Sequence, residues 1–385
     1  MTDRLPDAPP ILGDPPGSFA WDVLHRRHPA LIEQVRGGLP YPPDRLRALD
    51  ALTEEITGVI EPLDRDAHDR ATWDAWGAEY VGRPWPAVPF LWAESYFYRR
   101  LLGAVGYFGP GPWRGIDPFE PAKSAELADP ALDVDLAALD ELPGLPADEL
   151  VAALTGASLW GNRADLGFRI GAAPTEANED LVVDQRPRLW SLLAAARTVC
   201  VVADNAGREL LPDLLLIDHL LAAGGVARVA LHVKPHPYYV SDATMSDVIA
   251  ALRRLGGAPG YAAAVGERLR RAVGAGRLTV SAPDFYRAPW SFHRMPADLA
   301  AEFAAASLTV VKGDLNYRRL VGDRAWPATT PFEAVTAYFP GPVATLRTLK
   351  CDVVTGVPAE TLAALDGTGE PWRTNGTRAL VQVRG

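Results

Sequence analysis

The sequence predicts an α/β fold: a helical N-terminal part followed by a doubly wound part with a parallel sheet. Two observations lead to this fold class. Apolar, β-branched runs become evident only after residue 196, and helical segments separate most of them. Strands that are apolar along their whole length are typical of parallel sheets with helices on both faces. The 385 residues are also enough for two domains.

The N-terminal half contains helical patterns and no convincing strand. Residues 1–20 are rich in proline, and we expect a loosely ordered tail there. Apolar residues recur at helical spacing in Pro42–Ile60, and Pro89–Val105 is a second, aromatic-rich helix. The acidic stretch 126–150 is interrupted by prolines and predicts a loop with short helices, its charge facing solvent. We therefore expect a helical domain over residues 21–196.

Residues 197–385 are expected to form the α/β domain. Its predicted strands are Thr198–Ala203, Ala227–Val233, Arg277–Ser281, Leu308–Val311 and Val343–Leu346. Helical patterns at Arg208–Ala223 and Asp242–Leu255 lie between them. This alternation of strand and helix is the pattern of a doubly wound sheet.

Composition excludes several classes of protein. Asp and Glu number 48 against 38 Lys and Arg, and no basic tract is present that could neutralise a nucleic-acid backbone. No apolar stretch approaches the length of a membrane span, and no signal peptide is evident. Two cysteines, Cys200 and Cys351, fit a reducing compartment. We expect a cytoplasmic protein without nucleic-acid or membrane partners; the oligomeric state stays open.

Polar and charged residues follow every predicted strand. Those that stand out are Asp204, Asn205, Glu209, Lys234, Asp242, Asp284, the segment Lys312–Arg318, and Arg347–Lys350. Ligands of parallel α/β sheets bind outside the carboxyl ends of the strands, so these groups should converge on one site. Taken singly, each has a structural explanation: Asn205 suits a turn, while Asp242 and Asp314 could cap helices.

The chemistry of this set points to a metal and a phosphate. Asp204, Asn205 and Asp242 offer hard oxygen ligands, which suit Mg²⁺ or Mn²⁺ better than zinc. Four cations accompany them and suit an anionic substrate: Lys312, Arg318, Arg347 and Lys350. Carboxylates that hold a metal beside cations that hold a phosphate are the arrangement of metal-assisted phosphoryl transfer.

Other nucleotide and hydrolase motifs are absent from the sequence. The first strand leads into ADNAGRE, which has one glycine and not the G-x-G-x-x-G of a dinucleotide site. Neither a Walker sequence nor a G-x-S-x-G elbow occurs. His232 and His236 are four residues apart, but Pro235 between them prevents the helical pairing of zinc proteases.

Long segments of the sequence resemble a known family. VADNAGRELLPDLLLIDHLL, YYVSDATMSDV, VKGDLNYRRLVGDRAW and LRTLK resemble the metal-dependent damage-control phosphatases, once known only as a domain of unknown function. Arg347-Thr348-Leu349-Lys350 is similar to the RTxK signature of the sugar-phosphate subfamily, which includes a protein also described as an acidic-residue methyltransferase. AESYFYRRLL (93–102) and LWGNRADLGF (159–168) look like family segments as well.

The resemblance implies a helical domain followed by a three-layer α/β/α domain. It also implies roles for particular residues. Asp204, Asn205 and Asp242 match the family's catalytic metal ligands, and Glu209 matches a further site position. The positions that match its sugar-phosphate site are Asp314, Leu315, Asn316, Tyr317, Arg318 and Lys350. Glu94, Arg99 and Asn162 are expected to contribute from the helical side. The metal would be Mn²⁺ or Mg²⁺, with Co²⁺ or Ni²⁺ as alternatives.

The implied activity is metal-dependent hydrolysis of small sugar phosphates, such as fructose 1-phosphate or related hexose and pentose phosphates. The attacking group is either water or an aspartate. One alternative is an S-adenosylmethionine-dependent protein carboxyl methyltransferase, which the missing glycine loop disfavours. Another is a metabolite-binding protein without chemistry, which the intact set of Asp204, Asn205 and Asp242 disfavours.

Overall fold

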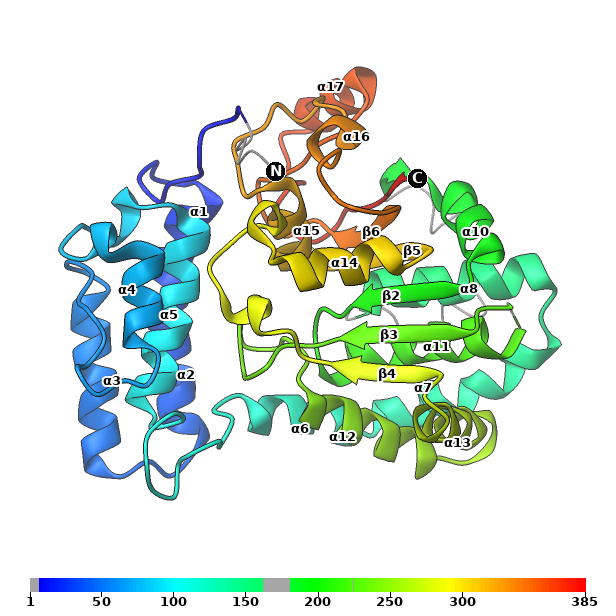
Figure 1. Cartoon of the computed structure of the whole chain (residues 1–385), viewed down its shortest axis with the longest axis horizontal. Coiled ribbons are helices and arrows are strands. Elements are labelled where there is room, and N and C mark those ends of the chain that lie inside the picture. The colour runs from blue at the N-terminus through cyan, green and yellow to red at the C-terminus, as the bar shows by residue number, and fades with distance from the viewer. Residues whose placement is uncertain (1–6, 162–180, 224) are drawn as a thin grey trace.

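The computed structural model describes residues 7–161, 181–223 and 225–385, which form a helical unit and a larger α/β unit (Figure 1). The helices of the helical unit are α1 (Phe19–Asp22), α2 (His28–Gly38), α3 (Pro43–Glu55), α4 (Arg70–Gly77) and α5 (Phe90–Ala104). Of these, α3 and α5 confirm the two helices predicted from periodicity. Helix α5 is buried along almost its whole length.

Aromatic packing holds the helical unit together. Trp92 and Tyr96, one turn apart on α5, stack with ring centroids 4.8 Å apart. Trp73 of α4 meets both rings edge-on or tilted. Such rings bury large apolar areas, so the core of this small unit depends on α5.

The α/β unit is built on a seven-stranded sheet in the order β1-β7-β6-β5-β2-β3-β4. The strands are β1 (Leu181–Asp184), β2 (Thr198–Val202), β3 (Arg228–His232), β4 (Leu278–Ser281), β5 (Leu308–Lys312), β6 (Val343–Thr348) and β7 (Ala379–Arg384). Neighbours from β6 to β4 pair in parallel, whereas β7 runs antiparallel to β6 and parallel to β1. The predicted class, a mainly parallel doubly wound sheet, is confirmed.

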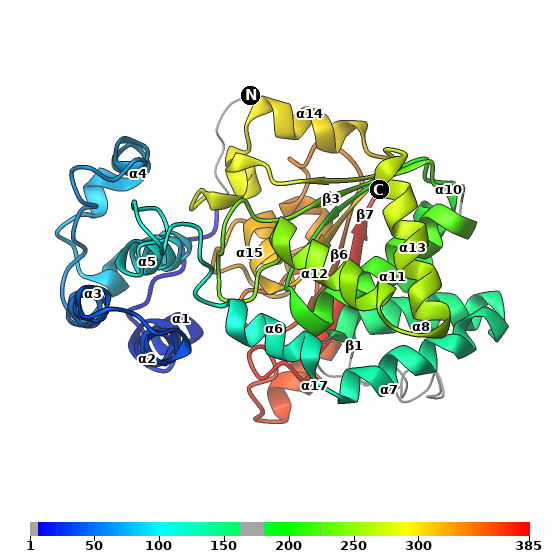
Figure 2. The ribbon, with the colours of Figure 1, turned by 90° about the horizontal axis from the view of Figure 1, so that it is seen from below.

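Helices cover both faces of the sheet. One face carries α7 (Ala131–Ala138), α8 (Ala147–Trp160), α10 (Arg186–Ala195), α11 (Leu210–Ala223), α12 (Met245–Gly256) and α13 (Gly260–Gly274). The other carries α14 (Ala297–Ala305), α15 (Asp314–Val321) and α16 (Phe332–Val335), while α17 (Ala359–Gly367) packs at its margin. Helices α14 and α8 lie on opposite sides of the strands in Figure 2.

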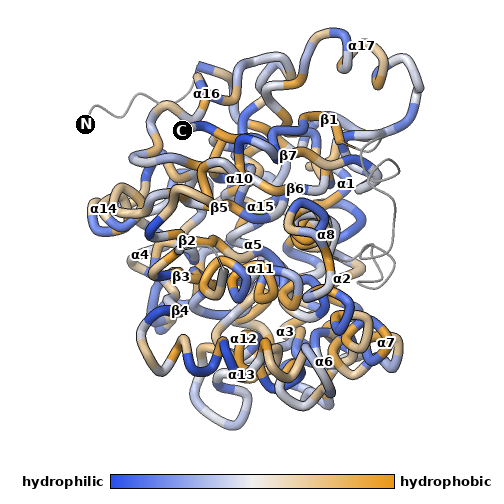
Figure 3. Tube along the Cα trace, turned by 90° about the vertical axis from the view of Figure 1, so that its right-hand side faces the viewer, coloured by the Kyte–Doolittle hydropathy of each residue, from blue (hydrophilic) through white to orange (hydrophobic). Residues whose placement is uncertain are grey.

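The side chains of each strand alternate between these two cores. Val199 and Val201 of β2 join the core with α11, and Cys200 and Val202 join the opposite one. This is why the strands read as apolar throughout. Helix α11 is itself largely apolar, and its turns are mainly orange in Figure 3.

Three expectations about organisation need correction. Strand β1 lies before residue 196, where no strand was predicted, and β7 was not predicted either. Leucines of α7, α8 and α10 pack in the core of the sheet, so the helical unit with its own core ends near Phe119 and not at 196. Periodicity predicts that a helix has an apolar face, but not which core that face joins.

The described part of the tail is held in place. The carbonyl oxygen of Ile11 accepts a hydrogen bond from Phe90 N at 2.8 Å, and that of Pro9 accepts one from Ala325 N at 3.0 Å. The tail therefore connects both units from residue 9 onward, contrary to the expected loose order. Among the described residues, no helix combines the length and apolarity that crossing a bilayer requires.

Candidate active site

The carboxyl ends of the parallel strands point toward the helical unit, as the arrowheads of β2, β3 and β4 show in Figure 1. Asp204 and Asn205 follow β2, and Asp242 lies in the long connection after β3. An isolated β-bridge joins Asn205 to Asp242. Ala243 N donates to the carbonyl oxygen of Asp204 at 2.9 Å. The structure thus brings together the three residues predicted to bind metal.

Asn205 lies in the middle of an acidic cluster. Its Nδ2 donates to Glu209 Oε2 at 2.9 Å and to Asp204 Oδ2 at 3.3 Å. Its Oδ1 accepts from the Ser241 hydroxyl at 2.7 Å. The amide group therefore bridges two carboxylates with its donor side. Turned over, the same amide would present an oxygen to a cation held there.

Electrostatics favour a cation in this cluster. Burial raises the pKa of Asp204 well above its usual range, and the carboxylates of Glu209 and Asp242 raise it further. Burial likewise raises the pKa of Asp242 to about 6, although Lys234 opposes the shift. Glu209 Oε1 and Asp242 Oδ2 are buried and accept no geometrically good hydrogen bond in the described structure, and the cation near Asp242 Oδ2 is Lys234, whose Nζ lies 3.2 Å away. A divalent ion would relieve this repulsion and satisfy these oxygens.

The residues present fit such an ion, and two of the three predicted ligands are charged. Within the described ranges, no three His, Cys, Asp or Glu side chains form a ready-made metal site. The set therefore consists of two carboxylates, Asp204 and Asp242, together with the amide oxygen of Asn205. Oxygen ligands of this kind suit Mg²⁺ or Mn²⁺, which retain several water ligands.

Lys350 is the predicted cation that reaches the acidic cluster. Its Nζ lies 3.9 Å from Glu209 Oε1, and 42% of its side chain is exposed. Burial lowers the pKa of Lys350, but the carboxylates of Glu209 and Asp204 outweigh this effect and the net shift is upward. Lys350 therefore stays charged and can move toward an anion beside the cluster.

Lys312 and Arg347 are engaged elsewhere, contrary to their predicted contact with phosphate. Lys312 Nζ pairs with Asp213 of α11 at 3.0 Å and with Ser158 of α8, on the face of the sheet away from α15. The fully buried Arg347 donates to Asp314 at 2.9 Å and to the carbonyl oxygens of the loop that follows Lys350. Both cations hold the frame of the site.

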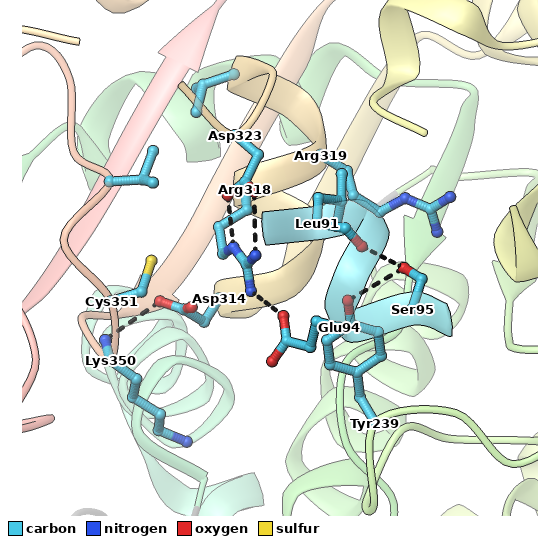
Figure 4. A network of polar contacts seen from close by, with 12 residues as sticks. Leu91, Glu94, Ser95, Tyr239, Asp314, Arg318, Arg319, Asp323, Lys350 and Cys351 are labelled. Carbon is cyan, nitrogen blue, oxygen red and sulfur yellow. Dashed lines mark hydrogen bonds and ion pairs between the residues drawn. The ribbon is translucent and has the colours of Figure 1, made fainter. Parts of the chain in front are cut away.

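Arg318 joins the two units. Its Nε donates to Asp323 at 2.7 Å, and its Nη1 donates to Glu94 of α5 at 2.7 Å (Figure 4). All three side chains are buried. Glu94 is thus near the site through Arg318, as predicted from the helical side. Arg99 is not, because it forms a bidentate pair with Asp69 at 2.6 and 2.8 Å.

The other side chains of segment 314–318 also have internal partners. Asn316 accepts from Lys234 Nζ at 3.0 Å and donates to the carbonyl oxygen of Ala203 at 2.8 Å. Tyr317 bonds with Thr355 at 2.9 Å, and Leu315 packs in the core of the helical unit. What this segment presents to a ligand is the N-terminus of α15, where backbone N–H groups are unpaired within the helix.

Asn162 lies outside the described residues. The last described residue before it, Gly161, borders the site, because an added Cβ there would lie 2.8 Å from Glu209 Cγ.

Two lysines at the site were not predicted. Lys234, at the end of β3, is buried with its Nζ 3.2 Å from Asp242 Oδ2. Its position directly after a strand is a sequence signal for the site, although that position alone assigns Lys234 no role. Lys123 of α6 (Glu120–Ala128) donates to the carbonyl oxygen of Asp242 at 3.3 Å and pairs with Asp117 and Asp247. No sequence signal connects Lys123 with the site.

A family model described as the damage-control phosphatase ARMT1-like domain matches residues 23–365. The chain belongs to the damage-control phosphatase ARMT1-like family. The family expected from the sequence motifs is thereby confirmed.

Several relatives of this ARMT1-like chain carry the name damage-control phosphatase ARMT1. That of Danio rerio is 30% identical over 429 aligned residues, covering 95% of this chain and 94% of the relative. That of Homo sapiens is 29% identical over 334 residues, covering 78% and 75%. A solved DUF89 family protein from Pyrococcus horikoshii is 16% identical, with a TM-score of 0.48 and coverage of 90% and 93%.

Proposed function

We propose that this protein is a metal-dependent phosphatase that hydrolyses phosphomonoesters of small sugars, in the manner of a metabolite damage-control enzyme. One observation carries the proposal: the buried carboxylates of Asp204 and Asp242 repel each other beside Asn205, and Lys350, whose side chain is 42% exposed, reaches the same cluster. Membership of the damage-control phosphatase family supports hydrolysis as the reaction class.

Asp204, Asn205 and Asp242 would hold one divalent ion, Mn²⁺ or Mg²⁺. When bound, such an ion supplies Lewis-acid polarisation of a phosphoryl oxygen. Lys350 would pair with another phosphoryl oxygen, and backbone N–H groups at the start of α15 would donate to the same phosphate. Arg347 fixes Asp314 so that the α15 terminus and Lys350 keep their relative positions.

The positions of the metal ligands depend on groups behind them. Lys234 contacts the Asp242 carboxylate and Asn316, while Lys123 contacts the Asp242 carbonyl oxygen. Groups that orient metal ligands in this way contribute to metal affinity, and their loss typically weakens metal binding.

A phosphatase screen tests the proposal directly. Release of phosphate from a panel of triose, pentose and hexose phosphates is measured with Mn²⁺, Mg²⁺, Co²⁺ or Ni²⁺. Wild-type protein should hydrolyse at least one sugar phosphate in a metal-dependent way, and Asp204→Ala should lose this activity. Asp298→Ala, at an exposed aspartate of α14, is the control and should match wild type. Equal turnover by Asp204→Ala and wild type would refute the assignment.

The methyltransferase alternative lacks a comparable observation. The turn after β2 has no glycine loop for the cofactor, and the relatives bear the name of a phosphatase. Incubation with labelled S-adenosylmethionine and an acceptor protein distinguishes the two, since transfer without any divalent metal would favour methylation.

A further inference from the structure

An unusual turn in the connection after β3 leads directly to Asp242. Ser241 N donates to the carbonyl oxygen of Tyr239 at 2.6 Å, which closes a three-residue turn around Val240. Tyr239 and Val240 have φ values of 49° and 57°, although neither is glycine. A three-residue turn with positive φ at its centre is the rare, strained form of this turn. Because Val240 is also β-branched, its conformation is a genuine outlier.

The turn directs the chain into a short antiparallel pairing at the candidate metal site. Ala206 N donates to the carbonyl oxygen of Ser241 at 2.6 Å. Ala243 N donates to the carbonyl oxygen of Asp204 at 2.9 Å. Asp242 lies between these two contacts, next to the end of the turn. The geometry of the turn therefore decides where the Asp242 carboxylate lies relative to Asp204.

The side chain of Tyr239 anchors this turn to helix α5 of the helical unit. Its ring stacks on that of Tyr98, with centroids 4.7 Å apart and an angle of 27° between the planes. Its hydroxyl oxygen lies 3.3 Å from Ser95 Oγ, as the dashed line in Figure 4 marks. Strained backbone persists only where the surrounding structure holds it, and these two contacts supply such a hold.

The hydrogen bond between Tyr239 and Ser95 has a defined direction. Ser95 Oγ already donates to the carbonyl oxygen of Leu91 at 2.6 Å, within α5. A hydroxyl group has one hydrogen atom, so the Tyr239 hydroxyl is the donor toward Ser95. Tyr239→Phe therefore removes the anchoring bond and strands no buried donor, because Ser95 keeps its bond to Leu91.

We propose that Tyr239 is a positioning residue through which the helical unit sets the metal affinity of the active site. Helix α5 holds the Tyr239 side chain, the side chain holds the strained turn, and the turn places Asp242. The α/β unit supplies the three metal ligands, but the group that fixes this turn belongs to the helical unit. The proposal deepens the proposed function and rests on it for the identity of Asp242 as a metal ligand.

Calorimetric titration with Mn²⁺ tests the anchor. Tyr239→Phe keeps the ring and loses one hydrogen bond, so Mn²⁺ should bind about two- to tenfold more weakly. Tyr239→Leu also loses the stacking on Tyr98 and should weaken binding about 10- to 100-fold. Tyr96→Phe is the matched control, because the Tyr96 hydroxyl donates to the carbonyl oxygen of Glu61 inside the helical unit. This control should bind Mn²⁺ like wild type. Wild-type affinity in both Tyr239 variants would overturn the proposal.

A second substitution distinguishes loss of the anchor from general destabilisation. Glycine adopts positive φ without strain, so Val240→Gly removes the need for an anchor. Tyr239→Leu should then weaken Mn²⁺ binding by less than about threefold in the Val240→Gly background, because the two residues act on one turn. If Tyr239→Leu costs the same affinity in both backgrounds, Tyr239 does not act through the turn and the proposal is wrong.

Hydrogen exchange of the metal-free protein separates this proposal from the proposed function. The amides of Ser241 and Ala243 are bonded within the turn and the pairing that follows it. Mass spectrometry of the peptide that contains them should show faster exchange in Tyr239→Leu and wild-type exchange in Tyr96→Phe. If wild-type protein binds no Mn²⁺, the proposed function fails, and the exchange still decides whether Tyr239 holds the turn. Equal exchange in Tyr239→Leu and wild type would overturn the proposal.

Discussion

Gly313→Ala should destroy the metal site while leaving the fold in place. Gly313 precedes α15 with φ 82° and ψ 179°, a conformation that is essentially restricted to glycine. A Cβ at this position would lie 1.8 Å from Asp204 Cγ and 1.9 and 2.2 Å from its two carboxylate oxygens. The missing side chain of Gly313 thus makes the space that the Asp204 carboxylate occupies.

The magnitude follows from these distances. Non-bonded carbon atoms prefer a separation of about 3.5–4.0 Å, so the carboxylate has to move by roughly 1.5–2 Å. A misplacement of about 1 Å in an active site can cost about 100-fold in rate, so we expect at least this loss in kcat/KM. The strained backbone adds a cost of about 1–3 kcal/mol in the free energy of unfolding.

Gly82→Ala is the matched control, because Gly82 has φ 80° and nothing lies within 4 Å of an added Cβ. Urea unfolding should show a similar loss of stability in both variants. Calorimetric titration with Mn²⁺ should show weakened binding in Gly313→Ala alone. If Gly313→Ala binds Mn²⁺ as tightly as Gly82→Ala, the position of Asp204 does not control the metal site and the reasoning is wrong.

Four further substitutions test other parts of the structure. Burial lowers the pKa of His28 to about 3, so below pH 6.5 the unfolded chain binds a proton at His28 and the folded protein does not. This difference should lower the free energy of unfolding by about 2 kcal/mol between pH 7 and pH 5. In urea unfolding, the stability of His28→Phe should therefore fall about 2 kcal/mol less than that of wild type over this pH range. Lys123→Met should weaken Mn²⁺ binding about 10- to 100-fold in calorimetry, because the Asp242 carbonyl oxygen loses its donor; wild-type affinity would contradict this role. Lys350→Ala should raise KM for a sugar phosphate at least tenfold in steady-state kinetics and leave Mn²⁺ affinity unchanged. Lys312→Met should instead lower the free energy of unfolding in urea by about 3–5 kcal/mol, because the buried Asp213 carboxylate loses its cation, and should leave KM unchanged.

The sequence was sufficient for the core of the sheet and for the convergence of groups at its edge. The five predicted strands are present, and Asp204, Asn205 and Asp242 meet because parallel strands end together. The sequence was not sufficient to predict which groups the lysine and arginine side chains contact. Position after a strand does not determine the face from which a side chain leaves, and Lys312 leaves β5 toward α11, where Asp213 neutralises it.

Long-range partners were also beyond the reach of local patterns. Lys123 reaches Asp242 from another part of the chain, and Arg318 finds Glu94 across the boundary between the two units. The short β1 pairs at the edge of the sheet with β7, which lies far along the chain, so no neighbouring strand in the sequence reveals β1. Such contacts depend on tertiary packing, which a single sequence does not encode in its spacing.

The reversed pair β1 and β7 has a consequence for folding. Leu181 pairs with Ala379, so β1 cannot join the sheet before residues 379–384 have docked on β6. Closing so long a loop slows folding, because its entropy is lost before the contacts form. During that interval β6 has an unpaired, apolar edge, which is a template for association with other chains. Newly made protein should therefore be most prone to aggregation while β7 is undocked, although the finished sheet hides β6 in its interior.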